Sequence, residues 1–430
     1  MSHPLCTVRV VRLLHTSDWH LGRLMDKASL LDEQAAAIDR IVEIARDQRV
    51  DVVVIAGDLY DRAIPPAPAV ELFSDALCRL HDLGTQVVAI SGNHDSVSRV
   101  GFGDQLLSRT GVTVRADARR AAEPVSVRAD DGGGPVSIYP IPYLDPVSVG
   151  PLVRAADQDA ADAVAPGADA AAGADAAAGR LTHLQVLDWA VHRAGTHRDA
   201  TVAGSSSPVR SVVVAHAFVT NTTAPPVVSD SERELAIGGA DQVDTDVFDG
   251  FDYVALGHLH GHQSWDEGRV AYSGTPLPYS FSEEHHTKAV RIVDLAPDGT
   301  RTVTVVPLGV GRPLRTVTGD LAELLADPLF RPAEGARVRA VLTDAVLPSH
   351  AMAQLRSRFP HASELVHQPP ATVLDGGRVA LTSARVRQAS PFDLTVEFLT
   401  EQHGEEPDTH SGELLRQAVA LATASSGGAA

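Results

Sequence analysis

The sequence predicts an α/β protein in which polar side chains follow the ends of parallel β-strands. Three observations support this fold class. The apolar, β-branched run at residues 52–56 ends in Gly57-Asp58, as expected for a buried parallel strand that brings a carboxylate to the edge of its sheet. Four other apolar runs also end in Asp, Asn or His side chains. Segments with helical spacing of apolar residues separate the first strands, which is typical of βαβ units.

Length and composition describe a globular chain with more than one domain. Its 430 residues exceed one ordinary core, and 44% are hydrophobic and 21% charged. With only Cys6 and Cys78, no disulfide framework is expected and a reducing, cytoplasmic location fits. We expect neither a signal peptide nor a membrane span. The formal charge of −19 by itself disfavours nucleic-acid binding, but bound cations would cancel part of it and a basic groove can coexist with an acidic remainder.

The chain begins with a βαβ pattern. A strand at residues 9–15 is followed by Asp18 and His20, which would project to the same side if the backbone between them stayed extended. A helix is expected at about residues 28–48, where apolar residues recur at core spacing. It leads into the strand that ends at Asp58.

The next unit repeats this arrangement. Prolines at 65, 66 and 68 predict the start of a second helix, and Gly84 marks its end. The strand at residues 86–91 then ends in Gly92-Asn93-His94-Asp95. Residues 111–143 read as short strands that extend the sheet.

The middle of the chain supplies further strands after an insertion. Residues 154–180 are rich in Ala, Asp and Gly, and we expect this insertion to be disordered or loosely helical. The strand at 211–215 ends in His216, and the strand at 252–256 ends in Gly257-His258-Leu259-His260. More strands are expected at 269–273 and 289–295.

Three domains are predicted: residues 1–310, a small α/β module at residues 311–385, and C-terminal helices at residues 386–430. Ser390-Pro391-Phe392-Asp393 has the pattern of a helix capping box. A second C-terminal helix is expected from Ser411. Because both helices carry short apolar stripes outside the main domain, they either dock on it or bind a partner.

The polar residues after the strands form a candidate metal site. Because the carboxyl ends of parallel strands meet at one sheet edge, these side chains should converge. Mixed imidazole, carboxylate and amide ligands without thiolate suit Mn²⁺, Fe²⁺ or Zn²⁺ in five- or six-coordinate geometry. The residues concerned are Asp18, His20, Asp58, Asn93, His94, His216, His258 and His260. Taken singly, an Asp here is more often a helix cap or turn residue and a His a hydrogen-bonded packing residue, but such roles do not explain five motifs at strand ends.

The number of ligands predicts two ions and a reaction. With His94 left out, the other seven side chains are too many for one ion with an open position, and Asp58 could bridge two. Such a pair would lower the pKa of a bound water and stabilise charge on a phosphate ester, so phosphoester hydrolysis is expected. If Asn93 occupies the metal position, His94 is free to protonate the leaving oxygen, with Asp95 orienting its ring.

In this order, the motifs D-x-H, G-D-x-x-D, G-N-H-D, H and G-H-x-H resemble the calcineurin-like metallophosphoesterase superfamily, over about residues 9–295. The resemblance implies a β-sandwich flanked by helices. It also implies that Asp18, His20, Asp58 and His260 bind one metal, that Asp58, Asn93, His216 and His258 bind the other, and that His94 is catalytic.

Within the superfamily, the chain resembles SbcD-type nuclease subunits through four runs: residues 15–22, 92–96, 255–260 and 273–281. This resemblance implies two Mn²⁺ ions, exonuclease activity on double-stranded DNA, and endonuclease activity on single strands or hairpins, in DNA repair and recombination. It further implies that residues 311–385 form a capping domain and that the C-terminal helices bind an SbcC-type ATPase. A homodimer within a heterotetramer would form through helices near residues 66–83 and 101–107.

Two other functions remain open. A small-molecule phosphodiesterase or nucleotidase would use the same metals, although a small substrate would need neither the cap nor the C-terminal helices. A non-catalytic scaffold that holds DNA ends for an ATPase would not need His94 and the full ligand set.

Overall fold

The computed structural model describes residues 10–127, 133–164, 181–205, 208–221, 224–232, 243–370, 390, 392–396 and 409–426. The chain divides into two compact units, residues 1–341 with 350–366 and residues 342–349 with 367–430. The first unit contains two six-stranded sheets.

The first sheet has the strand order β16-β15-β1-β4-β5-β6. Its parallel strands are β1 (Val11–Thr16), β4 (Val52–Ala56), β5 (Gln86–Ile90) and β6 (Val112–Arg115). The antiparallel strands β15 (Ala289–Leu295) and β16 (Arg301–Pro307) extend the sheet beside β1. Every residue of β4 is buried, which explains its uninterrupted apolar sequence.

The second sheet has the strand order β13-β14-β12-β9-β8-β7. Its central strands are parallel: β8 (Val136–Ile141), β9 (Arg210–His216), β12 (Tyr253–Gly257) and β14 (Val270–Tyr272). The edge strands β7 (Val125–Val127) and β13 (Gln263–Trp265) are antiparallel to their neighbours.

The two sheets pack face to face around an aliphatic core. Leu13, Val54 and Val88 from the first sheet belong to the same buried cluster as Val214 and Ala255 from the second. The outer face of each sheet is covered by helices, which is the layering expected of a helix-flanked β-sandwich. The predicted α/β fold class is therefore confirmed.

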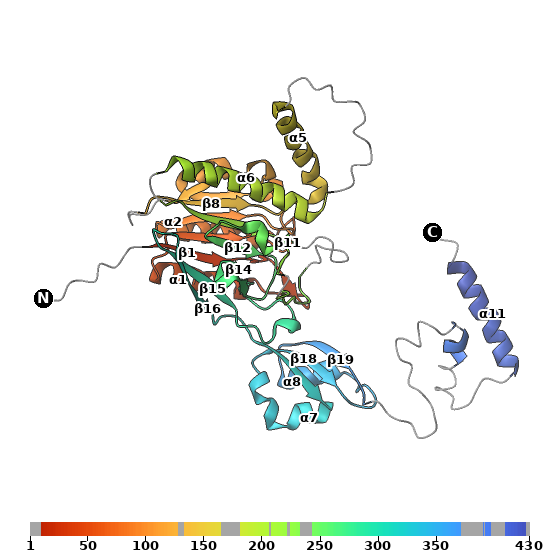
Figure 1. The fold of residues 1–430 in the computed structure, drawn as a ribbon. Coiled ribbons are helices and arrows are strands. Elements are labelled where there is room, and N and C mark those ends of the chain that lie inside the picture. The colour runs from red at the N-terminus through yellow and green to blue at the C-terminus, as the bar shows by residue number, and fades with distance from the viewer. Residues whose placement is uncertain are drawn as a thin grey trace. The chain divides into compact units, whose positions relative to one another are not determined.

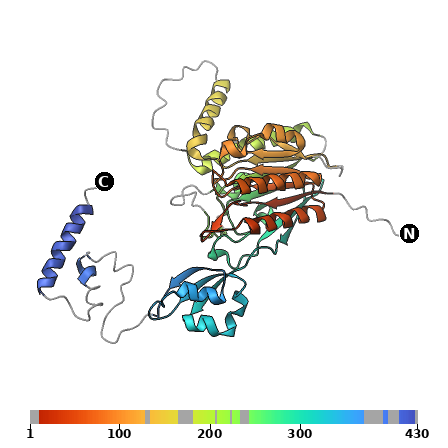
Figure 2. The same cartoon turned by 180° about the vertical axis from the view of Figure 1, so that it is seen from behind.

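Helices α1 (Leu31–Asp47) and α2 (Ala67–Asp82) lie side by side over the first sheet (Figure 2). Helices α5 (Pro146–Val164) and α6 (His183–Gly204) belong to the second sheet, where α6 runs along its outer face (Figure 1). Shorter elements connect these layers: β2 (Leu24–Met25), β3 (Ala28–Ser29), α3 (Val97–Val100), α4 (Asp104–Leu107), β10 (Val219–Thr220) and β11 (Val243–Asp244).

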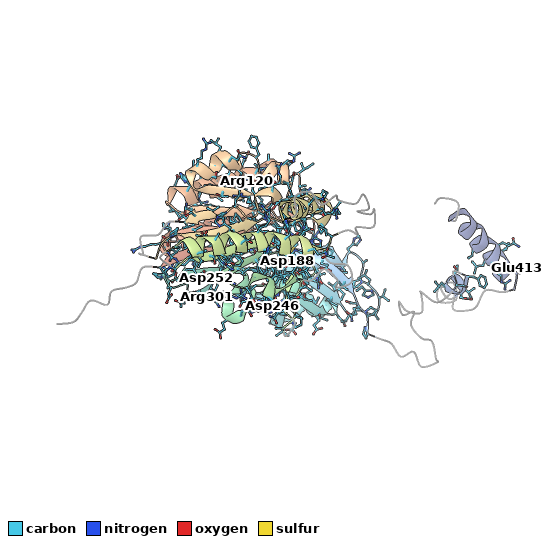
Figure 3. All side chains as sticks on the ribbon, turned by 45° about the horizontal axis from the view of Figure 1, so that its top comes forward. Arg120, Asp188, Asp246, Asp252, Arg301 and Glu413 are labelled. Atoms are coloured by element: carbon cyan, nitrogen blue, oxygen red, sulfur yellow. The ribbon has the colours of Figure 1, made fainter. Side chains whose placement is uncertain are left out.

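Asp252 fixes the amino-terminal ends of β9 and β12. Figure 3 labels it beside Arg301. The Asp252 carboxylate accepts a hydrogen bond from the Ser211 backbone N–H at 2.7 Å. Arg301 donates to the Asp252 carbonyl oxygen at 3.5 Å. These contacts help to set the register with which β9 and β12 deliver their last residues.

A three-stranded sheet follows the sandwich, in the order β17-β18-β19. Its elements are β17 (Leu314–Gly319), α7 (Leu321–Ala326), β18 (Arg337–Leu342), α8 (Ala351–Arg358) and β19 (Ala362–His367). Most of it belongs to the first compact unit: Arg337 pairs with Glu33 at 3.0 Å, and Leu314 packs in one cluster with Leu277 and Phe281. The boundaries expected at residues 310 and 385 stay a prediction.

The expected insertion at residues 154–180, predicted to be disordered or loosely helical, is only partly described. Residues 154–164 form the second half of α5. The alanines of this stretch have the highest helix propensity, so a helix that starts at Pro146 can continue through them. Residues 165–180 lie outside the described residues.

The C-terminal region contains the helical residues 392–396 and helix α11 (Thr409–Ser426). The Asp393 backbone N–H donates to Ser390 Oγ at 3.1 Å, which confirms the predicted cap. On α11, Arg416 pairs with Glu413 at 2.8 Å. Glu413 is labelled in Figure 3. In the part of the chain that the structure covers, no helix is both long and apolar enough to cross a membrane.

Candidate metal centre

The polar residues that follow the strands lie at one edge of the sandwich. Asp18 and His20 come after β1, Asp58 after β4, and Asn93 and His94 after β5 in the first sheet. The second sheet contributes the last residue of β9 and the loop after β12, which are His216, His258 and His260.

Two hydrogen bonds join the edges of the two sheets. His216 Nδ1 lies 2.9 Å from the Ala56 carbonyl oxygen, and the His258 backbone N–H donates to Asp18 Oδ1 at 2.9 Å. The structure thus brings residues from positions 18 to 260 into one site.

Three groups of side chains have ligand atoms that all lie within 4.8 Å of one another. The groups are Asp18, His20 and His260; His20, Asp58 and His94; and Asp18, Asp58 and His216. The Asp58 carboxylate is central, because its Oδ2 lies 3.5 Å from His20 Nε2 and 3.5 Å from His216 Nε2. In this position the carboxylate could bind a cation on either side.

The remaining predicted ligands border this cluster. Asn93 Oδ1 lies 2.8 Å from His216 Nε2. His258 is outside the three groups, and its ring centroid lies 5.5 Å from that of His216. Asn93 and His258 therefore lie on the His216 side of Asp58, whereas His20 and His260 lie together on the other, with ring centroids 5.1 Å apart.

Unpaired polar atoms in the site fit a divalent cation. Within the described part of the chain, both ring nitrogens of His20 and Nδ2 of Asn93 are buried without a hydrogen-bond partner. Leaving such groups buried and unpaired costs about 1–3 kcal/mol each. A cation between His20 and the carboxylates would accept a lone pair from the ring, so the residues present fit a metal centre.

Burial keeps the imidazoles neutral and therefore able to bind metal. It is the main cause that lowers the pKa of His216 and His260 and holds that of His20 and His258 well below the ordinary value. The pKa of Asp18 is raised well above its usual range, first by burial and then by the charge of Asp58. Two neighbouring buried carboxylates are a strong electrostatic reason for cations to bind here.

The backbone of the ligand loops is in the left-handed region at four non-glycine residues. The φ angles are 53° at Asp18, 44° at His20, 46° at Asp58 and 113° at His258. The backbone from Asp18 to His20 is therefore not extended. The side chains of these two residues reach the site from a tight turn instead. Such angles are uncommon and gather at functional sites, where surrounding structure enforces them.

Asp95 does not orient the His94 ring, contrary to expectation. Its carboxylate accepts hydrogen bonds from the backbone N–H groups of Leu59 and Tyr60, both at 3.0 Å, and of Gly92 at 2.9 Å. A short carboxylate that accepts three backbone donors is committed to joining the loops after β4 and β5. Asp95 thus positions the two loops, and none of these hydrogen bonds involves the His94 ring.

The His94 ring is held by Asp61. His94 Nδ1 lies 2.8 Å from the Asp61 carbonyl oxygen, which can only accept, so Nδ1 carries a proton. The His94 backbone N–H also donates to Asp58 Oδ1 at 2.9 Å. Asp61 is the last residue of the G-D-x-x-D motif, so the sequence contained a signal for it.

The sequence did not predict a relay, that is, a chain of hydrogen-bonded polar side chains that contacts His260. His260 Nδ1 lies 2.5 Å from Ser231 Oγ, which donates to Glu283 Oε1 at 2.5 Å. Lys288 Nζ donates to Glu283 Oε2 at 2.5 Å and to the His260 carbonyl oxygen at 2.9 Å. Because Ser231 can accept from Nδ1–H, the relay leaves His260 Nε2 as the free lone pair. Glu232 also contacts His260, because its Oε1 accepts a hydrogen bond from the His260 backbone N–H at 2.7 Å.

Residues 11–140 match the family model described as calcineurin-like phosphoesterase. This span contains the strands and loops that carry Asp18, His20, Asp58, Asn93 and His94. It ends before β9 and β12, which supply the other histidines.

Three solved structures are similar to the chain at low identity. TT1561 of Thermus thermophilus is 13% identical, covering 69% of this chain and 99% of that one, with a TM-score of 0.36. GAP50, the anchor in the inner membrane complex of Plasmodium, is 10% identical over 84% of this chain and 97% of its own, with a TM-score of 0.36. A dimetal phosphatase from Danio rerio is 12% identical over 69% of this chain and 99% of its own, with a TM-score of 0.33. Values this low do not by themselves establish a shared activity.

Proposed function

We propose that this chain, which carries a calcineurin-like phosphoesterase domain, is a metal-dependent DNA nuclease subunit of the SbcD type. The observation that carries the proposal is the position of Asp58 between His20 and His216, at 3.5 Å from each. A carboxylate with metal-binding side chains on both sides suits a two-ion site, and two-ion sites hydrolyse phosphate esters by in-line displacement.

The ligand residues would hold two divalent cations, proposed to be Mn²⁺. When bound, such cations supply a hydroxide near neutral pH and withdraw charge from the non-bridging phosphate oxygens. In this proposal Asp18, His20 and His260 serve one ion and Asn93, His216 and His258 the other, with Asp58 shared.

His94 is proposed to protonate the leaving oxygen. It is half-buried, whereas His20, His216, His258 and His260 are at most 3% exposed, so its ring can face a substrate. Because Nδ1 is held by the Asp61 carbonyl oxygen, the other nitrogen is the one that can exchange a proton with the substrate.

The first test is hydrolysis of DNA by the full chain. Chelator-treated protein is supplied with Mn²⁺ and given a labelled duplex, a hairpin and a nucleotide ester, with and without an SbcC-type ATPase. The proposal expects cleavage of the DNA substrates. Cleavage of the nucleotide ester with none of DNA would instead favour a small-molecule phosphodiesterase.

A His94→Ala variant separates a nuclease from a DNA-end scaffold. Loss of cleavage with retained DNA binding and retained Mn²⁺ binding is expected, since His94 is assigned to proton transfer. A variant that cuts at the rate of the parent chain would contradict the assignment.

An exposed apolar surface supports homodimerisation. Phe102 is 85% exposed and, with Phe73 and Leu77, lines a groove of about 370 Å³ between α2 and the loops near α4. Leu106 of α4 is 69% exposed. Large contiguous apolar patches commonly mark protein interfaces. A Phe102→Asp variant should lower the mass measured by light scattering from that of a dimer to that of a monomer, and an unchanged dimer mass would exclude this surface.

The C-terminal helices are proposed to bind the ATPase. On α11, Leu414 is 54% exposed and lies in a helix with an apolar stripe. Pull-down of an SbcC-type coiled-coil segment should be lost in a Leu414→Asp variant and retained in an Arg416→Ala variant.

A further inference from the structure

A cavity of about 730 Å³ opens beside the metal centre and has no role in the chemistry proposed above. Asn93 and Asp95 line its side nearest the metal ligands, and Tyr143 and His183 line another side. Its volume lies within the roughly 300–1,000 Å³ of small-ligand pockets. Through Asn93, the cavity is continuous with the place where a scissile phosphate would bind.

One wall of the cavity is aromatic. The rings of Tyr143 and His183 lie 5.7 Å apart between centroids, at an interplanar angle of 36°. The Tyr143 ring also meets the His216 ring edge-on at 6.3 Å. The Tyr143 backbone N–H donates to the Ser91 carbonyl oxygen at 2.9 Å, which ties this wall to the end of β5. The aromatic wall is therefore fixed relative to the metal ligands.

The lining of the cavity combines apolar and acidic side chains. Val149 and Leu152 of α5 are part of the apolar lining. Among the described residues that line the cavity, Arg119 alone carries a permanent positive charge, and it is already paired with Asp117 at 2.7 Å. Asp145 is a further carboxylate of the lining. This charge distribution repels phosphate groups and accepts a flat, uncharged ring.

We propose that this cavity binds an unpaired nucleobase of the nucleotide next to the scissile phosphate. The inference rests on the proposed nuclease function and adds to it the element of the substrate that is recognised. Stacking on aromatic side chains binds every base, so little sequence preference is expected. A base in an intact duplex cannot enter, so frayed ends, hairpin loops and single strands should be cut in preference to internal duplex positions.

The test compares the cleavage of a strand that carries a base next to the scissile bond with the cleavage of a strand that lacks it. Single-stranded oligonucleotides carry either a normal nucleotide or an abasic site next to the scissile bond, and kcat/KM is measured with Mn²⁺. In the parent chain the base-bearing strand should be cut about 5- to 150-fold faster, the range that one stacked base provides. In Tyr143→Ala this ratio should approach one, and Tyr143→Phe should restore it because the ring is retained.

A fluorescence measurement supplies a readout other than cleavage. A strand with 2-aminopurine at the same position, added to chelator-treated protein so that it is not cut, should be quenched on binding to the parent chain and less quenched by His183→Ala. His192→Ala is the matched control, since His192 is an exposed residue of the same helix.

The outcomes separate the two proposals. If the parent chain cuts neither strand, the nuclease function fails. If it cuts both strands at equal rates, with Tyr143→Ala equal to Tyr143→Phe, the base-binding cavity fails while the nuclease function stands.

Discussion

A buried glutamine holds the turn that carries two of the metal ligands, and its removal should weaken both folding and metal binding. Gln34 of α1 is 1% exposed. Its Nε2 donates to the carbonyl oxygens of His20 at 2.8 Å and Trp19 at 3.2 Å, and its Oε1 accepts from the Gly22 backbone N–H at 3.0 Å. Tyr279 supports the same turn by donating from its hydroxyl group to the Trp19 carbonyl oxygen at 2.5 Å.

The size of the effect follows from which groups lose their partner in Gln34→Met, a change that nearly conserves side-chain volume. The Gly22 N–H is left buried without an acceptor, which costs about 1–3 kcal/mol. The carbonyl oxygens of Trp19 and His20 keep other donors, Tyr279 and the Arg23 backbone N–H, so each loses only the net value of one bond, about 0.5–1.5 kcal/mol. The sum is a loss of about 2–6 kcal/mol in the free energy of unfolding.

Metal binding should weaken in the same variant, because a looser turn no longer presents Asp18 and His20 together. Supporting residues of this kind typically change metal affinity about 10- to 100-fold. Urea unfolding of chelator-treated protein and calorimetric titration with Mn²⁺ measure the two effects. Gln48→Met, at the exposed end of the same helix, is the control. A Gln34→Met chain that unfolds at the parent urea concentration and binds Mn²⁺ with parent affinity would refute the reasoning.

Three further predictions follow from single contacts. Ser231→Ala removes the partner of His260 Nδ1 and should reduce Mn²⁺ affinity about 10- to 100-fold by calorimetry, whereas Ser357→Ala, at an exposed position of α8, should leave it unchanged. Burial, followed by the charge of Arg291, lowers the pKa of His15 to about 3 from an ordinary value of 6.5. Between these values the unfolded chain binds a proton that the folded chain excludes, so the stability contributed by this residue should fall by about 2 kcal/mol from pH 8 to pH 5. Urea unfolding at both pH values should show that the free energy of unfolding depends less on pH in His15→Asn than in the parent chain. An equal pH dependence in the two chains would contradict the lowered pKa of His15. Gly92→Ala places a methyl group against the Asp58 carboxylate and should abolish Mn²⁺-dependent hydrolysis, while Gly195→Ala, in open space on α6, should stabilise the fold by about 0.5–1 kcal/mol.

The sequence was sufficient to predict which strand ends meet. Asp18, Asp58 and Asn93 each follow an apolar run, and the carboxyl ends of parallel strands in one sheet must lie on the same side. The same argument applies to His216 and His258 in the second sheet. The residue types alone predicted a single sheet edge for all the ligands. The division of the strands between two sheets was implied only by the resemblance to a β-sandwich family.

The supporting contacts could not be predicted in the same way. Glu283 ends a short 3₁₀ helix (Phe281–Glu283), and Lys288 lies in the loop before β15, so their approach to His260 depends on how the chain returns from the second sheet to the first. Asp95 shows the reverse difficulty. Its place directly after His94 suggested contact with that ring, but the turn directs its carboxylate to backbone donors on another loop. Neighbours in sequence point apart whenever the backbone turns sharply.

The left-handed backbone at Asp18, His20, Asp58 and His258 shows where the geometry of the metal centre originates. Residues in such conformations cost of order 1–3 kcal/mol each and persist only when the surrounding structure enforces them. Here that structure is the fully buried ends of β1, β4 and β12, together with backbone hydrogen bonds such as His20 N–H to the Asp58 carbonyl oxygen at 2.9 Å. The sandwich core therefore supplies the energy that holds the ligands in place. Substitutions that loosen this core should reduce metal affinity even where they touch no ligand.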